Sequence, residues 1–165
     1  MNTFDVILHP TDFSAESDQA FSLACNIARD QFAQLVVVHV LAPSSCPGCD
    51  SDADLLNEER PAVSGCREHF QLMRAHAGDI PLSFRIALGY AVGTILNVAR
   101  QEQADLIVIA SHQHTPHKLQ LHGSIAEGVL RQAHCPVFCL RQPTLYPVAS
   151  SVPVTRREPQ RECVW

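Results

Sequence analysis

The chain has 165 residues, of which 46% are hydrophobic and 18% are charged, and its formal net charge is −5 at pH 7. This length and balance predict one folded domain with its own core and exclude a collagen-like or wholly disordered chain. The negative charge disfavours a nucleic-acid-binding protein, and every apolar run is far shorter than the roughly 20 residues of a membrane-spanning helix. Because the first residues also lack the pattern of a secretory signal, we expect a cytoplasmic protein that binds neither nucleic acid nor membrane.

Segments with the pattern of buried strands alternate with segments of helical periodicity from residue 6 to residue 141. The expected strands cover residues 6–9, 35–40, 83–88, 105–110 and 136–141. The expected helices begin after Ser14 and near residues 63, 92 and 124, with apolar residues at helical spacing. This alternation predicts the α/β class, with an open parallel sheet covered by helices on both faces.

Two segments interrupt or end the alternation. Residues 43–61 combine proline, serine and glycine with five acids, so we expect a long loop there. Residues 142–165 show no periodicity and contain four prolines, so we expect a Pro-rich tail that buries too little to order itself. The predicted domain therefore spans residues 1–141.

A ligand of an open parallel sheet binds beyond the carboxyl ends of the strands, where the winding direction reverses. Asp12 follows the first strand. Its carboxylate either accepts hydrogen bonds from a ribose or an adenine amine, or simply favours the start of the next helix through the helix dipole. Gly123 and Ser124 open the fourth helix, where the free N–H groups either hold a phosphate or need only an N-cap.

Several motifs in combination resemble the universal stress protein family. They are residues 6–14 (VILHPTDFS), 38–40 (VHV), 104–109 (ADLIVI), 123–126 (GSIA) and 135–137 (CPV). The resemblance covers residues 3–141 and implies a Rossmann-like five-stranded sheet in the order 3-2-1-4-5. It also implies a homodimer joined through the last strand, Pro136 to Arg141. The family has members that bind ATP or AMP and members that do not.

Nucleotide-binding members of the family carry a phosphate loop of the form G-x2-G-x9-G-[S/T] after the fourth strand. The corresponding positions here are Ala110, Gln113, Gly123 and Ser124, so the first two glycines are replaced. Glycine reaches positive φ and lets the backbone approach a phosphate, whereas another residue in that conformation costs roughly 1–2 kcal/mol. The two substitutions predict a degraded nucleotide-binding loop.

Histidines in the same loop leave an alternative open. His112, His114, His117 and His122 accompany Lys118, and their positive charge would hold a phosphate in place of backbone geometry. The imidazoles are also potential metal ligands. By resemblance, the candidates for contact with a nucleotide are Pro10, Asp12, Val40, Ile109, Ala110, Gln113, Gly123, Ser124, Ile125 and Ala126.

The cysteines suggest a separate site. The chain has 7 cysteines, an odd number that a reducing cytosol would keep mostly as thiols. Cys46, Cys49, Cys66 and His69 form the pattern C-x2-C-x16-C-x2-H, which fits a tetrahedral zinc site of three thiolates and one imidazole. The alternatives are a C-x-x-C redox pair and a structural thiol, because Cys66 also falls on the apolar stripe of its helix. Nothing in the family resemblance covers this pattern.

Patterns that indicate catalysis are weak. The chain has no G-x-S-x-G nucleophile elbow, and the paired acids Asp52 and Asp54 fall in the expected loop. We therefore expect no enzyme and no required cofactor, but a dimeric stress-response module that acts by regulated association with an unidentified protein. Two alternatives remain: an ATP or AMP sensor that uses the histidine loop, and a zinc or thiol switch.

Overall fold

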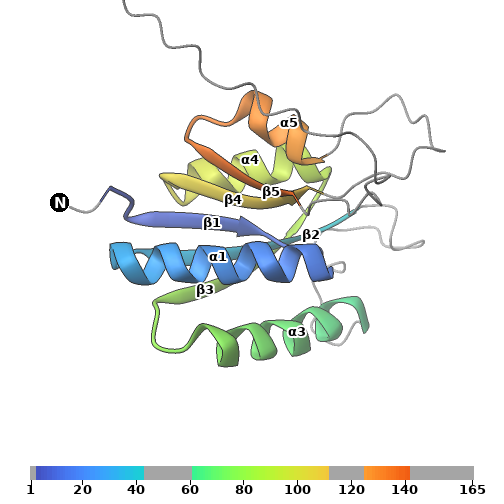
Figure 1. Cartoon of the computed structure of the whole chain (residues 1–165). Helices are drawn as coiled ribbons and strands as arrows, with labels where there is room; N and C mark the ends of the chain where they lie inside the picture. The colour runs from blue at the N-terminus through green and yellow to red at the C-terminus, as the bar shows by residue number, and fades with distance from the viewer. Residues whose placement is uncertain (1–2, 43–60, 112–124, 142–165) are drawn as a thin grey trace, which may run out of the picture.

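The computed structural model describes residues 3–42, 61–111 and 125–141. Five parallel strands form one sheet in the order β3-β2-β1-β4-β5 (Figure 1). The strands are β1 (Val6–Pro10), β2 (Gln34–Leu41), β3 (Leu82–Leu88), β4 (Leu106–Ser111) and β5 (Val137–Arg141). The helices are α1 (Ala15–Gln31), α3 (Pro61–Ala77), α4 (Ala91–Gln101) and α5 (Ile125–Gln132). This arrangement confirms the predicted Rossmann-like α/β fold and its strand order.

The chain winds in two directions from the central strand β1. It first passes to β2 and β3 at one edge of the sheet, then returns to β4 on the other side of β1 and ends at β5 on the opposite edge. The winding direction therefore reverses between β1 and β4. The carboxyl ends of these two neighbouring strands are the usual place for a ligand in such a sheet.

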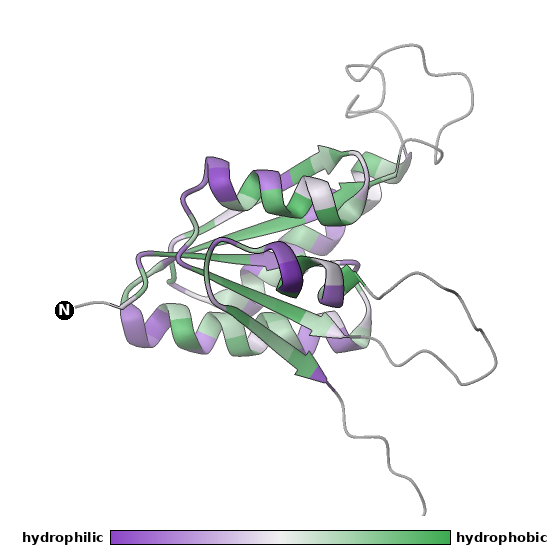
Figure 2. Cartoon of the chain, turned by 90° about the horizontal axis from the view of Figure 1, so that it is seen from above, coloured by the Kyte–Doolittle hydropathy of each residue, from purple (hydrophilic) through white to green (hydrophobic). Residues whose placement is uncertain are grey.

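Helices cover both faces of the sheet, with α1 and α3 on one face and α4 and α5 on the other (Figure 1). Successive strand residues point to opposite faces. Leu35 and Val37 of β2 therefore pack with α1 and α3, whereas Val36 and Val38 pack on the α4 and α5 face. All four side chains are fully buried. This burial on two sides explains why β2 is apolar without alternation, and Figure 2 shows the sheet as the most hydrophobic layer of the molecule.

Helix α1 starts at the predicted cap. The side-chain oxygen of Ser14 accepts a hydrogen bond from the N–H of Ser17 at 3.2 Å, which satisfies one of the free donors of the first turn. The helix ends at Phe32, which adopts a left-handed conformation with φ 54°. Strand β2 then follows almost at once, in register with β1.

Four segments lie outside the described residues, namely residues 1–2, 43–60, 112–124 and 142–165. The predictions of a loop before α3 and of a Pro-rich tail fall in these segments. So do the predictions for Cys46, Cys49, Gln113, Gly123 and Ser124. Among the helices that the structure does describe, none is both long enough and apolar enough to cross a membrane.

Candidate functional site

Seven of the ten predicted nucleotide-contacting residues are described. They lie at the carboxyl ends of strands or in the segments that follow those strands. Pro10 is the last residue of β1, and Val40 is the last residue but one of β2. Ile109 and Ala110 lie near the end of β4. These three strands are neighbours, with β1 in the middle. The remaining described candidates are Asp12, Ile125 and Ala126. The structure therefore brings the described members of the predicted set to the carboxyl end of the sheet, near the reversal point between β1 and β4.

Apolar side chains cover one face of the sheet at this end of the strands. Val40, Ile109 and Ala126 belong to the same apolar cluster on the α4 and α5 face, and Ile109 and Ala126 are both only 4% exposed. Ile125, at the start of α5, is half exposed. Ala110 points to the opposite face and packs in the cluster beneath α1 and α3. Its methyl group, which replaces a glycine hydrogen of the family loop, is therefore accommodated by core packing.

The loop between β1 and α1 is held by hydrogen bonds to Thr11. The Thr11 N–H donates to the carbonyl oxygen of Val38 at 2.9 Å, which extends the pairing of β1 with β2. The Thr11 hydroxyl oxygen accepts from the Phe13 N–H and from the Ser17 hydroxyl, each at 3.1 Å. Thr11 is 6% exposed, and these hydrogen bonds provide its buried polar groups with partners inside the protein.

Asp12 takes part in the start of α1. Its Oδ1 accepts from the Ser14 N–H at 3.1 Å and from the Ser14 hydroxyl at 2.6 Å. The first of the two sequence interpretations of Asp12, contact with a ribose or an adenine, stays a prediction. The second, an acid that favours a helix start, has direct support from these contacts.

Phe13 is the most unusual residue of the site. Its φ of 61° is left-handed, which is unfavourable for a bulky residue. Its ring stacks against the imidazoles of His39 and His69, in both cases with ring centroids 4.5 Å apart, and meets the edge of Phe70 at 5.6 Å. The Nδ1–H of His39 donates to the carbonyl oxygen of Thr11 at 2.8 Å. Packing between β2 and α3 therefore stabilises the strained loop conformation.

His9 lies beneath this loop and is completely buried. Its Nδ1 is 2.8 Å from the carbonyl oxygen of Val108, and because a carbonyl only accepts, Nδ1 carries the proton. Its Nε2 has no hydrogen-bond partner among the described residues. Burial lowers the pKa of His9 from 6.5 to about 4, although the Val108 carbonyl and the charge of Asp12 act in the opposite direction. His9 is therefore neutral at pH 7 and supplies no positive charge for a phosphate.

The sequence analysis missed His9, Phe13 and His39 as parts of this site. A signal for two of them existed, because His9 and His39 are polar residues within otherwise apolar strands. The left-handed conformation of Phe13 has no comparable signal, since the residue type itself disfavours it.

Of the predicted zinc ligands, the structure describes Cys66 and His69. Cys66 is 4% exposed in the apolar cluster beneath α1 and α3, and burial raises the pKa of its thiol. His69 is exposed, and its Nδ1–H donates to the Gly65 carbonyl oxygen at 2.9 Å. A cysteine binds zinc as a thiolate, and the apolar surroundings of Cys66 disfavour the loss of its proton. No group of three or more potential ligands capable of holding a metal occurs within the described ranges, and the zinc site stays a prediction.

Comparison with known proteins identifies the family. The sequence profile of the universal stress protein family matches residues 3–141. The chain belongs to this family. A universal stress protein of Methanocaldococcus jannaschii is 29% identical over 149 residues, which cover 86% of this chain and 85% of the relative.

Solved structures of universal stress proteins share the fold. One in complex with cAMP has a TM-score of 0.67 and 23% identity, covering 84% of this chain and 97% of that chain. Another, from Archaeoglobus fulgidus in complex with dAMP, has a TM-score of 0.57 and 20% identity, covering 84% and 98%. The match supports the fold and its sheet order.

Proposed function

We propose that this universal stress protein is a regulatory module without catalytic activity of its own, which works as a homodimer joined through β5 and associates with another protein. The observation that carries this proposal is the composition of the β5 edge. Phe138, the second residue of the strand, is 51% exposed, and Cys139 in the middle of the strand is also exposed. Figure 2 shows β5 as a mostly hydrophobic strand at the edge of the sheet.

An edge of this kind favours association. Within the described part of the chain, β5 pairs only with β4, so the backbone groups of its outer side are available to another strand. Helix α5, which contacts β5, adds the half-exposed side chain of Leu130. Water contact with Phe138 and Leu130 is unfavourable, and a second copy of the same surface would remove it.

The hydroxyl contacts of the candidate site support the absence of catalysis. Ser14 donates to a carboxylate and Ser17 donates to another hydroxyl. A serine nucleophile needs a neighbouring base such as an imidazole. Neither hydroxyl is hydrogen-bonded to an imidazole among the described residues, because Ser14 contacts Asp12 and Ser17 contacts Thr11. In this arrangement the polar groups hold the loop in place.

Sedimentation equilibrium tests the dimer. The wild-type chain is expected to sediment with twice its mass of 18.2 kDa. Phe138→Asp places a charge in the proposed interface and should give a monomer. Phe32→Asp is the matched control, because Phe32 is 84% exposed at the end of α1 and lies outside the proposed interface. A monomeric wild type, or a dimer that survives Phe138→Asp, would contradict the proposal.

Adenine-nucleotide binding is a second candidate. Two observations support it. Two structural neighbours form complexes with cAMP and dAMP, and the described candidate residues of this chain lie at the carboxyl end of the sheet. Gln113 opposes it, since it replaces a glycine of the phosphate loop, whereas the methyl of Ala110 packs in the core. Thermal unfolding with and without ATP, AMP and cAMP distinguishes the candidates.

The regulatory proposal predicts no saturable rise in melting temperature for the wild type. Ala110→Gly combined with Gln113→Gly should create or strengthen a response, because both restore the glycines of the loop. A ligand present at 100 times its Kd stabilises by about 2.7 kcal/mol, which such an experiment detects readily. A saturable response of the wild type would favour the nucleotide sensor instead.

A further inference from the structure

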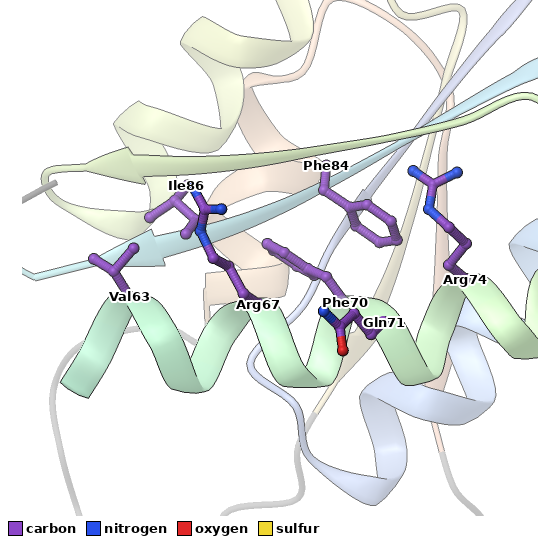
Figure 3. Close-up of a pocket in the computed structure, with 7 residues that line it drawn as sticks. All are labelled: Val63, Arg67, Phe70, Gln71, Arg74, Phe84 and Ile86. Carbon is purple, nitrogen blue, oxygen red and sulfur yellow. The ribbon is translucent and has the colours of Figure 1, made fainter. Parts of the chain in front are cut away.

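A cavity lies away from the site described above, between α3 and β3. Its volume is about 440 Å³, within the range of sites for small organic ligands (Figure 3). Its lining residues come from α3 and from β3, the edge strand on the opposite side of the sheet from β5. It shares no residue with the nucleotide candidates or with the proposed dimer edge.

Two aromatic rings form the middle of this cavity. Phe70 of α3 and Phe84 of β3 stack with their centroids 4.5 Å apart and their planes inclined by 24°. Phe84 and Ile86 are only half-buried, so part of their apolar surface faces the cavity. Val63, near the start of α3, adds an aliphatic wall. A ligand with an apolar body would remove this surface from water.

Two arginines flank the apolar middle. Arg67 and Arg74 are seven residues apart on α3, which is two turns or about 10 Å along the helix, so they lie on the same side. Figure 3 shows both side chains directed from α3 toward β3, with the rings of Phe70 and Phe84 between them. Among the described lining residues none is acidic. The cavity therefore combines aromatic surface with two positive charges.

Arg74 is already held in position. Its guanidinium carbon lies 5.1 Å from the centroid of the Phe84 ring, and its Nη2 donates to the carbonyl oxygen of Leu82 at 3.1 Å. A guanidinium has five N–H donors, so this contact leaves donors for a ligand. Because the group is positioned before binding, a carboxylate that contacts it requires little further ordering.

We propose that this cavity binds a small aromatic carboxylate. The aromatic body would lie against Phe70, Phe84 and Ile86, and the carboxylate would accept charge-assisted hydrogen bonds from Arg67 or Arg74. The proposal depends on both halves of the ligand. An inorganic anion lacks the apolar body, and a neutral aromatic molecule lacks the partner for the arginines.

The test uses 2-naphthoate as the probe with the full-length, isotopically labelled protein. Amide chemical shifts are followed during titration, and 2-naphthalenemethanol and acetate serve as the neutral and the non-aromatic comparison. Binding of 2-naphthoate should shift residues 63–74 and 82–86 in a saturable way. Each comparison compound should bind about tenfold more weakly or worse, because it keeps only one of the two interactions.

Arginine variants make the test specific. Arg67→Gln should weaken 2-naphthoate binding about tenfold, since the amide keeps polarity and length but loses the charge. Arg100→Gln, at an exposed position of α4 on the other face of the sheet, is the matched control and should bind like the wild type. Arg74→Gln is expected to weaken binding as well, but it also removes a contact of Phe84.

Four results would overturn the proposal. The first three are the absence of saturable shifts, shifts centred on β1 and β4, and affinities of the Arg67→Gln and Arg74→Gln variants that both equal the affinity of Arg100→Gln. Equal binding of the naphthoate and the neutral alcohol would also overturn it, because the arginines would then have no role. None of these outcomes bears on the β5 dimer, which is measured separately.

Discussion

His9 makes the stability of this protein depend on pH in a direction that the structure determines. Its pKa is about 4 in the folded protein, against 6.5 for the ordinary group, because burial disfavours the charged imidazole. Between these two values the unfolded chain binds a proton at His9 and the folded chain does not. The free energy of unfolding therefore falls as the pH falls from 6.5 toward 4, and above pH 6.5 His9 has no such effect.

The size of the effect follows from the two pKa values. A shift of one pKa unit corresponds to 1.36 kcal/mol, so the full loss approaches about 3 kcal/mol at pH 4 and is about 2.5 kcal/mol at pH 4.5. This is a large part of the 5–15 kcal/mol by which native domains are usually stable. Protonation at Nε2 would place a charge where no described residue offers an acceptor.

Urea unfolding at pH values from 7.5 to 4.5 measures the effect in wild type and His9→Asn. The asparagine amide can donate to the Val108 carbonyl in place of Nδ1–H but does not titrate. The stability of the wild type relative to the variant should decline by about 2.5 kcal/mol over this range. His134→Asn, at an exposed position, controls for the loss of an imidazole. Parallel stability curves for wild type and His9→Asn would refute the reasoning.

Further predictions concern single substitutions, each measured by urea unfolding at pH 7. Gly128→Ala should destabilise by about 1 kcal/mol, because the added Cβ would lie 2.8 Å from a methyl of Val92 and the overpacking outweighs the gain in helix propensity. Gly65→Ala, with no atom within 4 Å of the new Cβ, should instead stabilise by up to about 1 kcal/mol. If both substitutions changed the free energy of unfolding in the same direction, the packing of α4 on α5 would be contradicted. Ser14→Ala removes the cap of α1 and should cost about 1 kcal/mol. Gly89→Ala should cost about 2 kcal/mol, because φ is 139° there; an unchanged stability would contradict that conformation.

The helices and strands were predictable because their burial is periodic along the chain. Residues 35–38 are apolar on both sides of the strand, and they became the centre of β2. Ser14 was recognised as a cap because a hydroxyl next to a helical pattern satisfies free N–H groups. Each of these signals lies within a few residues, and no distant contact is needed to interpret it.

The candidate site was predictable only in part. Pro10 and Asp12 were identified because they follow a strand that a parallel sheet places at its ligand-binding edge. The stacking of Phe13 on His39 and His69 was not, since these residues are far apart in the sequence and meet only when α3 packs against the sheet. The same holds for the cavity at Arg67 and Arg74, whose far wall comes from β3.

The amino-acid sequence by itself determined the fold class, the order of helices and strands and the family, because local periodicity and short motifs carry that information. Only the tertiary structure decided that Cys66 is buried and that His69 is exposed. One turn of α3 places the first in the core and the second on the surface, where it meets Phe13. It also decided that His9 is neutral, because the charge of a titratable group depends on how completely the assembled elements exclude water from it.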